Sequence, residues 1–189
     1  MNDSVYMMRR AKQQLANKWV QVAIGSLIYL VIMLLVGCTY ILPYILSGPF
    51  TFGYILYVAC LVDTEQNNLN LLFKGFERFV ETLLAGLLIL LAVSVGTVLL
   101  IVPGIIVALV FSMTFYIMVD DPNISGLDAM QLSWNMMKGK KWNLFCLELR
   151  FLGWVLLCIL TCGIGYIFLM PYMTATLLNF YRQLRYGTY

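Results

Sequence analysis

Long apolar stretches separated by short polar segments dominate the chain. Three of these stretches, residues 19–63, 79–120 and 142–182, are nearly continuous. A helix needs about 20 apolar residues to cross roughly 30 Å of hydrocarbon, so each stretch is long enough for two spans. The pattern therefore predicts an all-α polytopic membrane protein with six transmembrane helices arranged as three hairpins.

A shorter segment with helical periodicity precedes each hairpin. Its apolar residues recur at spacings of three, four and seven, which places them on one face of a helix that lies on the membrane surface. Ser125, with Asp128 three residues later, is typical of a capped helix start. We therefore predict three short amphipathic helices at the cytoplasmic surface. Their apolar faces are Val5, Met8, Leu15 and Trp19; Leu69, Leu72, Phe73 and Phe76; and Leu127, Met130, Trp134 and Met137.

The combination of a surface helix and a hairpin recurs three times. Each surface helix ends at an aromatic residue, Trp19, Phe79 or Trp142, and a proline follows within each hairpin. This periodicity indicates internal repeats within one membrane domain. The alternative is that every helical hairpin needs an interfacial aromatic residue and a turn. The repeats would cover residues 4–63, 67–121 and 125–185 of the single domain 1–189.

The prolines of the hairpins have two predicted roles. Pro43 and Pro103 are expected to mark turns at the hairpin tips. Pro49 and Pro171 are expected inside returning helices as kinks, where neighbouring helices can satisfy the freed carbonyl groups.

The composition of the chain agrees with a membrane protein, and its positive charges predict how the protein is oriented in the membrane. Hydrophobic residues make up 62% of the chain and charged residues 11%, with a mean hydropathy of +0.87, which leaves too little polar surface for a soluble globule. Lysines and arginines precede every hairpin and close the chain, so the positive-inside rule predicts cytoplasmic N- and C-termini. A cleaved signal peptide is not expected, because a long polar segment precedes the first span. The net charge of +3 follows from this orientation, and no nucleic-acid partner is expected.

The second half of the chain carries motifs of a known family. The runs are YIMVDDPNISGLDAM, LSWNMMKGKKWNLFCLELRFLGW and LTCGIGYIFLMPYMTATLLNFY. They resemble an uncharacterised family of bacterial integral membrane proteins, a domain of unknown function, whose pattern has a DNP-like turn, MKG-K, a span ending in GW, T-x-GIG, and PY followed by FY. The family is distantly similar to the membrane domain of some glycerophosphodiester phosphodiesterases. The resemblance implies a six-helix protein of the bacterial cytoplasmic (inner) membrane, and it brings no established activity or site residues. Arg150 stands where the pattern has serine.

Two opposite charges lie inside the predicted fifth span. Counted from Trp142, Glu148 and Arg150 lie about 9 and 12 Å deep at 1.5 Å per residue, and they point in nearly opposite directions. An intramembrane charge costs about 2.5 to 3.5 kcal/mol even on lenient scales, so both are candidate functional residues. We expect Arg150 to contact an acceptor such as Glu81 or to line a cytoplasm-open cavity, with Glu148 more exposed. The alternative is that both side chains snorkel to the headgroups, with Arg150 against the ring of Trp154.

The returning helices end in charged residues at the predicted cytoplasmic side. Spans two and four end in acidic residues, which the negative end of a helix disfavours, whereas span six ends in basic residues. These groups could form a charge network that closes the cytoplasmic mouth, or a weak cation site. The alternative is solvated helix ends, with an Asp-Pro-Asn turn acting only as a helix stop. The residues are Asp63, Glu65, Asp120, Asp121, Arg182 and Arg185.

No residue pattern predicts catalysis or a cofactor. The chain has no histidine, no G-x-S-x-G motif and no glycine-rich phosphate loop followed by lysine. Five cysteines without histidine exclude the usual zinc patterns. A disulfide among Cys38, Cys158 and Cys162 is one interpretation of their expected position near the outer face, and buried small apolar residues are the other. We predict that the protein is not an enzyme and has no cofactor or metal.

The repeats, kinked helices and intramembrane charges favour one functional hypothesis. The protein handles or senses an amphipathic or lipid-like molecule, as a transporter or an export accessory, with membrane lipids as its partners. The alternative is a membrane-embedded interaction or immunity-type protein that acts through a protein partner docked on the surface helices.

Overall fold

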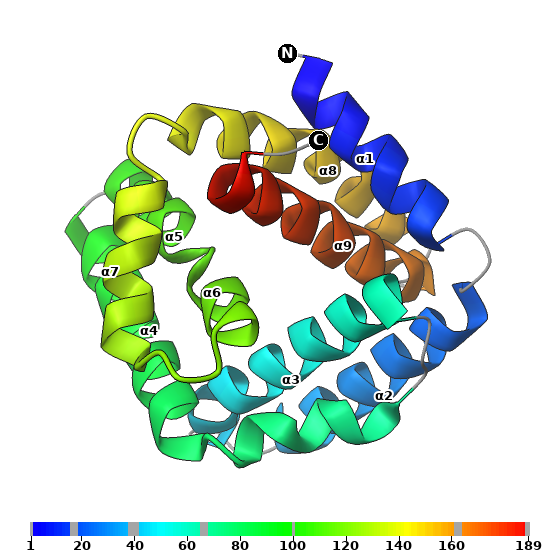
Figure 1. The fold of residues 1–189 in the computed structure, drawn as a ribbon, viewed down its shortest axis with the longest axis horizontal. Coiled ribbons are helices and arrows are strands. Elements are labelled where there is room, and N and C mark those ends of the chain that lie inside the picture. The colour runs from blue at the N-terminus through cyan, green and yellow to red at the C-terminus, as the bar shows by residue number, and fades with distance from the viewer. Residues whose placement is uncertain are drawn as a thin grey trace.

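The computed structural model describes residues 2–15, 19–37, 42–64, 68–99, 101–160 and 164–187 (Figure 1). In these residues the chain is helical and contains no strand, so the predicted all-α class is confirmed. The helices are α1 (Asn2–Leu15), α2 (Trp19–Gly37), α3 (Leu42–Thr64), the 3-10 helix η1 (Leu69–Phe76), α4 (Phe79–Leu99), α5 (Ile101–Phe111), α6 (Thr114–Asp120), α7 (Gly126–Met136), α8 (Lys141–Leu160) and α9 (Ile164–Tyr186).

Four helical stretches are long and apolar enough to cross a membrane: Leu46–Asp63, Phe79–Thr97, Val102–Asp120 and Lys141–Ile159. Helix α2 contributes a shorter apolar stretch, Trp19–Val31. Only 17% of the residues in Phe79–Thr97 and 22% of those in Lys141–Ile159 are buried within the protein, so these apolar surfaces suit a lipid environment. The fold is that of a membrane protein with several apolar helices.

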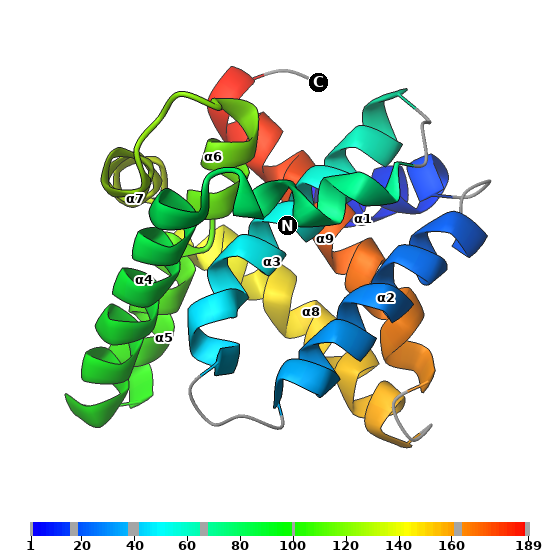
Figure 2. The ribbon, with the colours of Figure 1, turned by 90° about the horizontal axis from the view of Figure 1, so that it is seen from below.

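The long helices run between two ends of the molecule. Figure 2 shows α1, η1 and α7 together at one end, and α3, α6 and α9 finish there. We call this the surface-helix end. Seen from that end in Figure 1, α1, η1 and α7 form a rim around α3, α6 and α9. Consecutive long helices contact each other: α2 with α3, α4 with α5, and α8 with α9.

Helices α3 and α9 hold the bundle together because both contribute to each of two apolar clusters. In one cluster, Tyr57 and Leu61 of α3 and Ala175 of α9 pack with residues of α1, α2 and η1. In the other, Tyr181 of α9 packs with Phe52 of α3 and with residues of α4 to α8. The two clusters that α3 and α9 share are therefore apolar.

The three predicted surface segments are separate helices. The first and third are the α-helices α1 and α7, and the second is the 3-10 helix η1. A Cβ added at Gly75 would lie 1.9 Å from the carbonyl oxygen of Pro49, and one added at Gly53 would lie 2.1 Å from that of Leu72. The backbone of η1 therefore packs directly on that of α3, which requires glycine at both contacts.

The predicted start of the third surface helix is confirmed. The Oγ of Ser125 accepts a hydrogen bond from the backbone N–H of Asp128 at 3.2 Å and donates one to Asp128 Oδ2 at 2.8 Å. Helix α7 begins at the next residue, Gly126. This arrangement satisfies one of the N–H groups that a helix start leaves unpaired.

Two of the proline predictions are wrong and the other two placements are confirmed. Pro103 is the third residue of α5 and Pro43 the second residue of α3, so neither lies in a turn. The first turn of a helix tolerates proline because its N–H groups have no intrahelical partner. Pro49 and Pro171 lie inside α3 and α9, as expected. Cys38 and Cys162, two of the three cysteines in the disulfide alternative, fall outside the described residues. Cys158 is buried, as the alternative of a small apolar residue expects.

Candidate functional site

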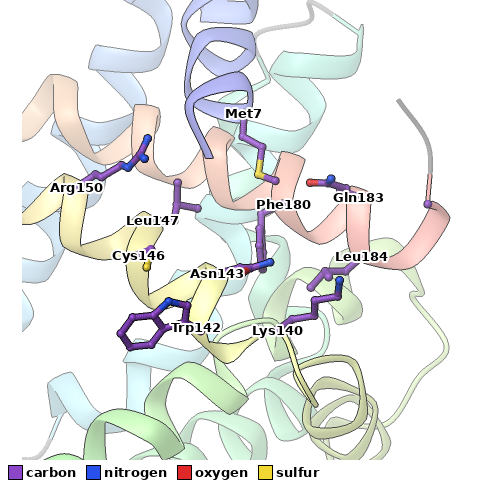
Figure 3. A pocket seen from close by; sticks show the side chains of 11 residues that line it. Met7, Lys140, Trp142, Asn143, Cys146, Leu147, Arg150, Phe180, Gln183 and Leu184 are labelled. Atoms are coloured by element: carbon purple, nitrogen blue, oxygen red, sulfur yellow. The ribbon is translucent and has the colours of Figure 1, made fainter. Parts of the chain in front are cut away.

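A pocket of about 480 Å³ opens between α1, α8 and α9, near the surface-helix end (Figure 3). Helix α8 and the turn before it supply most of its wall, α9 supplies the facing wall, and α1 contributes one side chain. The labelled side chains are Met7 from α1; Lys140, Trp142, Asn143, Cys146, Leu147 and Arg150 from α8 and its preceding turn; and Phe180, Gln183 and Leu184 from α9.

The pocket combines positive charge with apolar surface. Lys140 and Arg150 are its two cations and lie at opposite ends of it in Figure 3. Asn143 and Gln183 add amide groups, and none of the described lining residues is acidic. The remaining wall is largely apolar. Such a site offers donors and positive potential to an anion, next to surface that an apolar group can cover.

Helical spacing explains why these α8 residues share the pocket. Cys146, Leu147 and Arg150 lie three, four and seven residues after Asn143, so the four residues share one face of α8. Glu148, two residues before Arg150, is on the opposite face and is exposed. Arg150 thus lines a cavity and Glu148 is the more exposed of the two charges, as expected for this span.

Glu81, one of several acceptors expected for Arg150, forms an ion pair with Arg78 three residues earlier. The guanidinium of Arg78 also donates to the carbonyl oxygen of Ile124, in the segment that leads into α7. This contact ties the start of α4 to the loop before α7. In the described part of the chain, Arg78 Nη1 is buried and has no hydrogen-bond partner.

A second group of charges connects α9 to the ends of α3 and α6. Arg182 donates two hydrogen bonds to Asp63, from Nη1 to Oδ1 at 2.7 Å and from Nη2 to Oδ2 at 2.5 Å. Arg185 Nε lies 3.2 Å from Asp120 Oδ2. The acids at two helix C-termini are thus offset by arginines of α9, which removes the unfavourable interaction with the helix dipole.

Two tyrosines complete this charge network. Asp120 Oδ2 accepts hydrogen bonds from the hydroxyl groups of Tyr181 at 2.9 Å and Tyr186 at 2.5 Å. The hydrogen bond to Asp120 raises the pKa of Tyr186, the last residue of α9. Sequence reasoning missed both tyrosines. Their signal was the spacing of Tyr181 from Arg185 and of Arg182 from Tyr186, which at four residues places each pair on one helix face.

The charge network borders a smaller pocket of about 220 Å³ between α3, α6 and α9. Asp63, Asp120, Tyr181 and Arg182 line it. Asp63 and Asp120 are each paired with an arginine of α9, so these two acids belong to a charge network. That this network closes a cytoplasmic mouth remains a prediction. The described residues contain no cluster of three or more His, Cys, Asp or Glu side chains suited to a metal ion.

The remaining two acids of the predicted group are Asp121 and Glu65. Asp121 Oδ1 accepts a hydrogen bond from the backbone N–H of Asn123 at 3.1 Å, so it stabilises the turn after α6. A turn of this kind is what the alternative interpretation of the Asp-Pro-Asn sequence, as a helix stop, expects. Glu65 lies outside the described residues.

Comparisons with known proteins give one match. A family model described as Protein of unknown function (DUF975) matches residues 92–187. That range runs from within α4 to the end of α9 and includes the α8 and α9 walls of the larger pocket. No curated protein and no solved structure matches the chain.

Proposed function

We propose a function for this chain, which belongs to the family described as Protein of unknown function (DUF975): it binds an amphipathic or lipid-like molecule in a bacterial inner membrane. It would transport or sense that molecule, or assist its export, without catalysing a reaction. The carrying observation is the pocket between α1, α8 and α9, which places two cations and two amides beside an apolar wall. An amphiphile has the same two kinds of surface.

The proposed topology has six spans in three hairpins, with both termini in the cytoplasm. The hairpins are α2 with α3, α4 with α5 and α6, and α8 with α9. The contacts within each pair support this arrangement, and the position of α1, η1 and α7 at one end supports a common cytoplasmic face. The internal repeats also remain part of the proposal. They are supported by the starts of α2 at Trp19, α4 at Phe79 and α8 beside Trp142.

The position of the pocket along α8 supports an amphiphile rather than a water-soluble ligand. Trp142 marks the predicted interface at the start of α8, and Arg150 lies eight residues further along, or about 12 Å at 1.5 Å per residue. A ligand that reaches Arg150 therefore passes from the interface into the apolar part of the span. Distant similarity to the membrane domain of glycerophosphodiester phosphodiesterases also remains part of this proposal.

Ligand retention by purified protein tests the proposal. The full chain would be purified in mild detergent and analysed by native mass spectrometry. Cys146→Trp places a large ring in the pocket, whereas Leu152→Trp places the same ring on the exposed outer face of α8. We expect bound amphiphile in the native protein and in Leu152→Trp, and loss of it in Cys146→Trp. Equal retention in all three proteins, or no bound amphiphile in any, would contradict the proposed function.

A second candidate is an interaction or immunity-type protein that acts through a membrane partner. The observation that favours it is exposed apolar surface on the surface helices: Phe73 of η1 is 52% exposed, and Leu127 and Trp134 of α7 are 62% and 44% exposed. A membrane interface can cover the same side chains. Recovery of a partner at a fixed ratio, and its loss on Leu127→Glu, would favour this second candidate over a ligand-binding bundle.

A further inference from the structure

We infer that the pocket between α1, α8 and α9 selects an amphiphile with an anionic phosphate headgroup, which contacts Arg150 while its chain leaves along the face of α8 that carries Gly153, Trp154 and Leu157. The inference rests on the proposed function and names the ligand class for the same site. Three observations carry it: the charges that line the pocket, the continuation of the pocket face along α8, and an open space at Gly153.

The charges of the lining favour an anion. Arg150 and Lys140 are positive, the amides of Asn143 and Gln183 can donate hydrogen bonds, and the described lining contains no carboxylate. A zwitterionic headgroup would place its own cation beside these two positive side chains, which favours an anionic headgroup over a zwitterionic one. Arginine suits phosphate because its planar guanidinium can donate two parallel hydrogen bonds.

The two cations have different roles because they lie at opposite ends of the pocket (Figure 3). They are ten residues apart, or about 15 Å along the helix axis at 1.5 Å per residue, so one phosphate is not held equally by both. Arg150, at the end nearer the apolar part of α8, contacts the headgroup directly. Lys140, exposed in the turn before α8, attracts it through the electric field.

The face of α8 that carries Arg150 becomes apolar beyond it. Gly153, Trp154 and Leu157 follow at spacings of three, four and seven, and all three are exposed. A Cβ added at Gly153 would meet no atom within 4 Å, so there is open space beside the helix three residues beyond Arg150. Leu157 lies about 10 Å beyond Arg150 along the axis. This surface provides a route on which an acyl chain can lie.

The test compares lipids with the same chains and different headgroups. The full-length protein in detergent micelles would be titrated with short-chain phosphatidic acid, phosphatidylcholine and inorganic phosphate, using calorimetry. We expect phosphatidic acid to bind about tenfold or more tightly than phosphatidylcholine. Inorganic phosphate should bind much more weakly, because it cannot use the apolar route.

Charge variants assign the selectivity to the pocket. Arg150→Gln should reduce the affinity for phosphatidic acid to that for phosphatidylcholine, and Arg150→Lys should retain part of the preference. Lys140→Gln should weaken phosphatidic acid binding about twofold to fivefold, and less so at high salt. Lys138→Gln is the matched control, because Lys138 is exposed nearby and does not line the pocket. An effect of Lys138→Gln as large as that of Arg150→Gln would overturn the inference.

Variants of the apolar route test it without changing any charge. Gly153→Trp fills the open space and should weaken phosphatidic acid binding, whereas Leu152→Trp on the opposite, exposed face should not. If Arg150→Gln fails to fold, Gly153→Trp and Leu152→Trp still test whether the lipid chain lies on this route. Unchanged binding in Gly153→Trp would overturn the proposed route.

The remaining outcomes separate this inference from the proposed function. Equal binding of phosphatidic acid and phosphatidylcholine would overturn anion selectivity while leaving amphiphile binding intact. Binding of inorganic phosphate as tightly as phosphatidic acid would identify a soluble anion as the ligand and overturn the lipid assignment. Absence of binding by every lipid would overturn both.

Discussion

Arg182 binds both carboxylate oxygens of Asp63, a residue 119 positions earlier in the chain. The pair joins the end of α3 to the last turns of α9, beside the smaller pocket. The neighbouring Asp120 joins α6 to the same helix through Arg185 and Tyr181. Three helices that finish at the surface-helix end are thus connected by charged and hydrogen-bonded contacts.

The Asp63–Arg182 pair should stabilise the fold modestly. The side chains of Arg182 and Asp63 are 28% and 45% exposed, so solvent screens their attraction despite the two hydrogen bonds. A double-mutant cycle with Asp63→Asn and Arg182→Gln, measured by denaturant unfolding in detergent, should give a coupling of about 0.5 to 1 kcal/mol. High salt should reduce it. A coupling of zero at low salt would mean that the pair contributes nothing to stability.

The contact between η1 and α3 should not tolerate a side chain at Gly75. Its Cβ would lie 1.9 Å from the carbonyl oxygen of Pro49, a backbone atom that cannot move independently. We expect Gly75→Ala to lower the free energy of unfolding by about 1 to 3 kcal/mol. Gly153→Ala is the matched control, because its Cβ meets no atom within 4 Å and alanine favours a helix. Equal unfolding midpoints for the two variants would disprove the close contact.

The cap at Ser125 should stabilise α7. Ser125→Ala removes the acceptor for the N–H of Asp128 and should cost about 1 kcal/mol, whereas Ser125→Asp keeps an acceptor and should cost less. Ser94→Ala serves as the control, because the hydroxyl of Ser94 is exposed and bonds only to carbonyl groups of its own helix. Thermal unfolding of the three variants measures the difference. A loss in Ser94→Ala as large as that in Ser125→Ala would exclude a specific role for the cap.

Cysteine labelling should establish the orientation in the membrane. In a variant with all five native cysteines replaced, a membrane-impermeant thiol reagent applied outside should label Thr97→Cys, near the end of α4. It should not label Lys12→Cys, Lys74→Cys or Lys140→Cys, which lie at the surface-helix end and are exposed. Thr97 is a better probe than the neighbouring Gly96, which is buried against Gly104. Labelling of the lysine positions from outside would reverse the proposed topology.

The sequence by itself determined most local structure. Hydrophobic periodicity separates surface segments from long apolar helices, and the helices begin at or beside the aromatic residues Trp19, Phe79 and Trp142. The cap at Ser125 was also predictable, because a capping box uses only residues within one turn. These features depend on residues close together in the chain, so their pattern can be read without the fold.

The tertiary structure alone decided which distant residues meet. The sequence placed acids and bases at the helix ends, but only the packing of α3 and α6 on α9 pairs Asp63 with Arg182 and Asp120 with Arg185. Likewise, helical spacing predicted that Arg150 and Glu148 face opposite ways, whereas the position of α9 and α1 decided that Arg150 lines a pocket. The reason is physical: periodicity defines the faces of a helix, and which face is covered depends on neighbours that lie far away in the sequence.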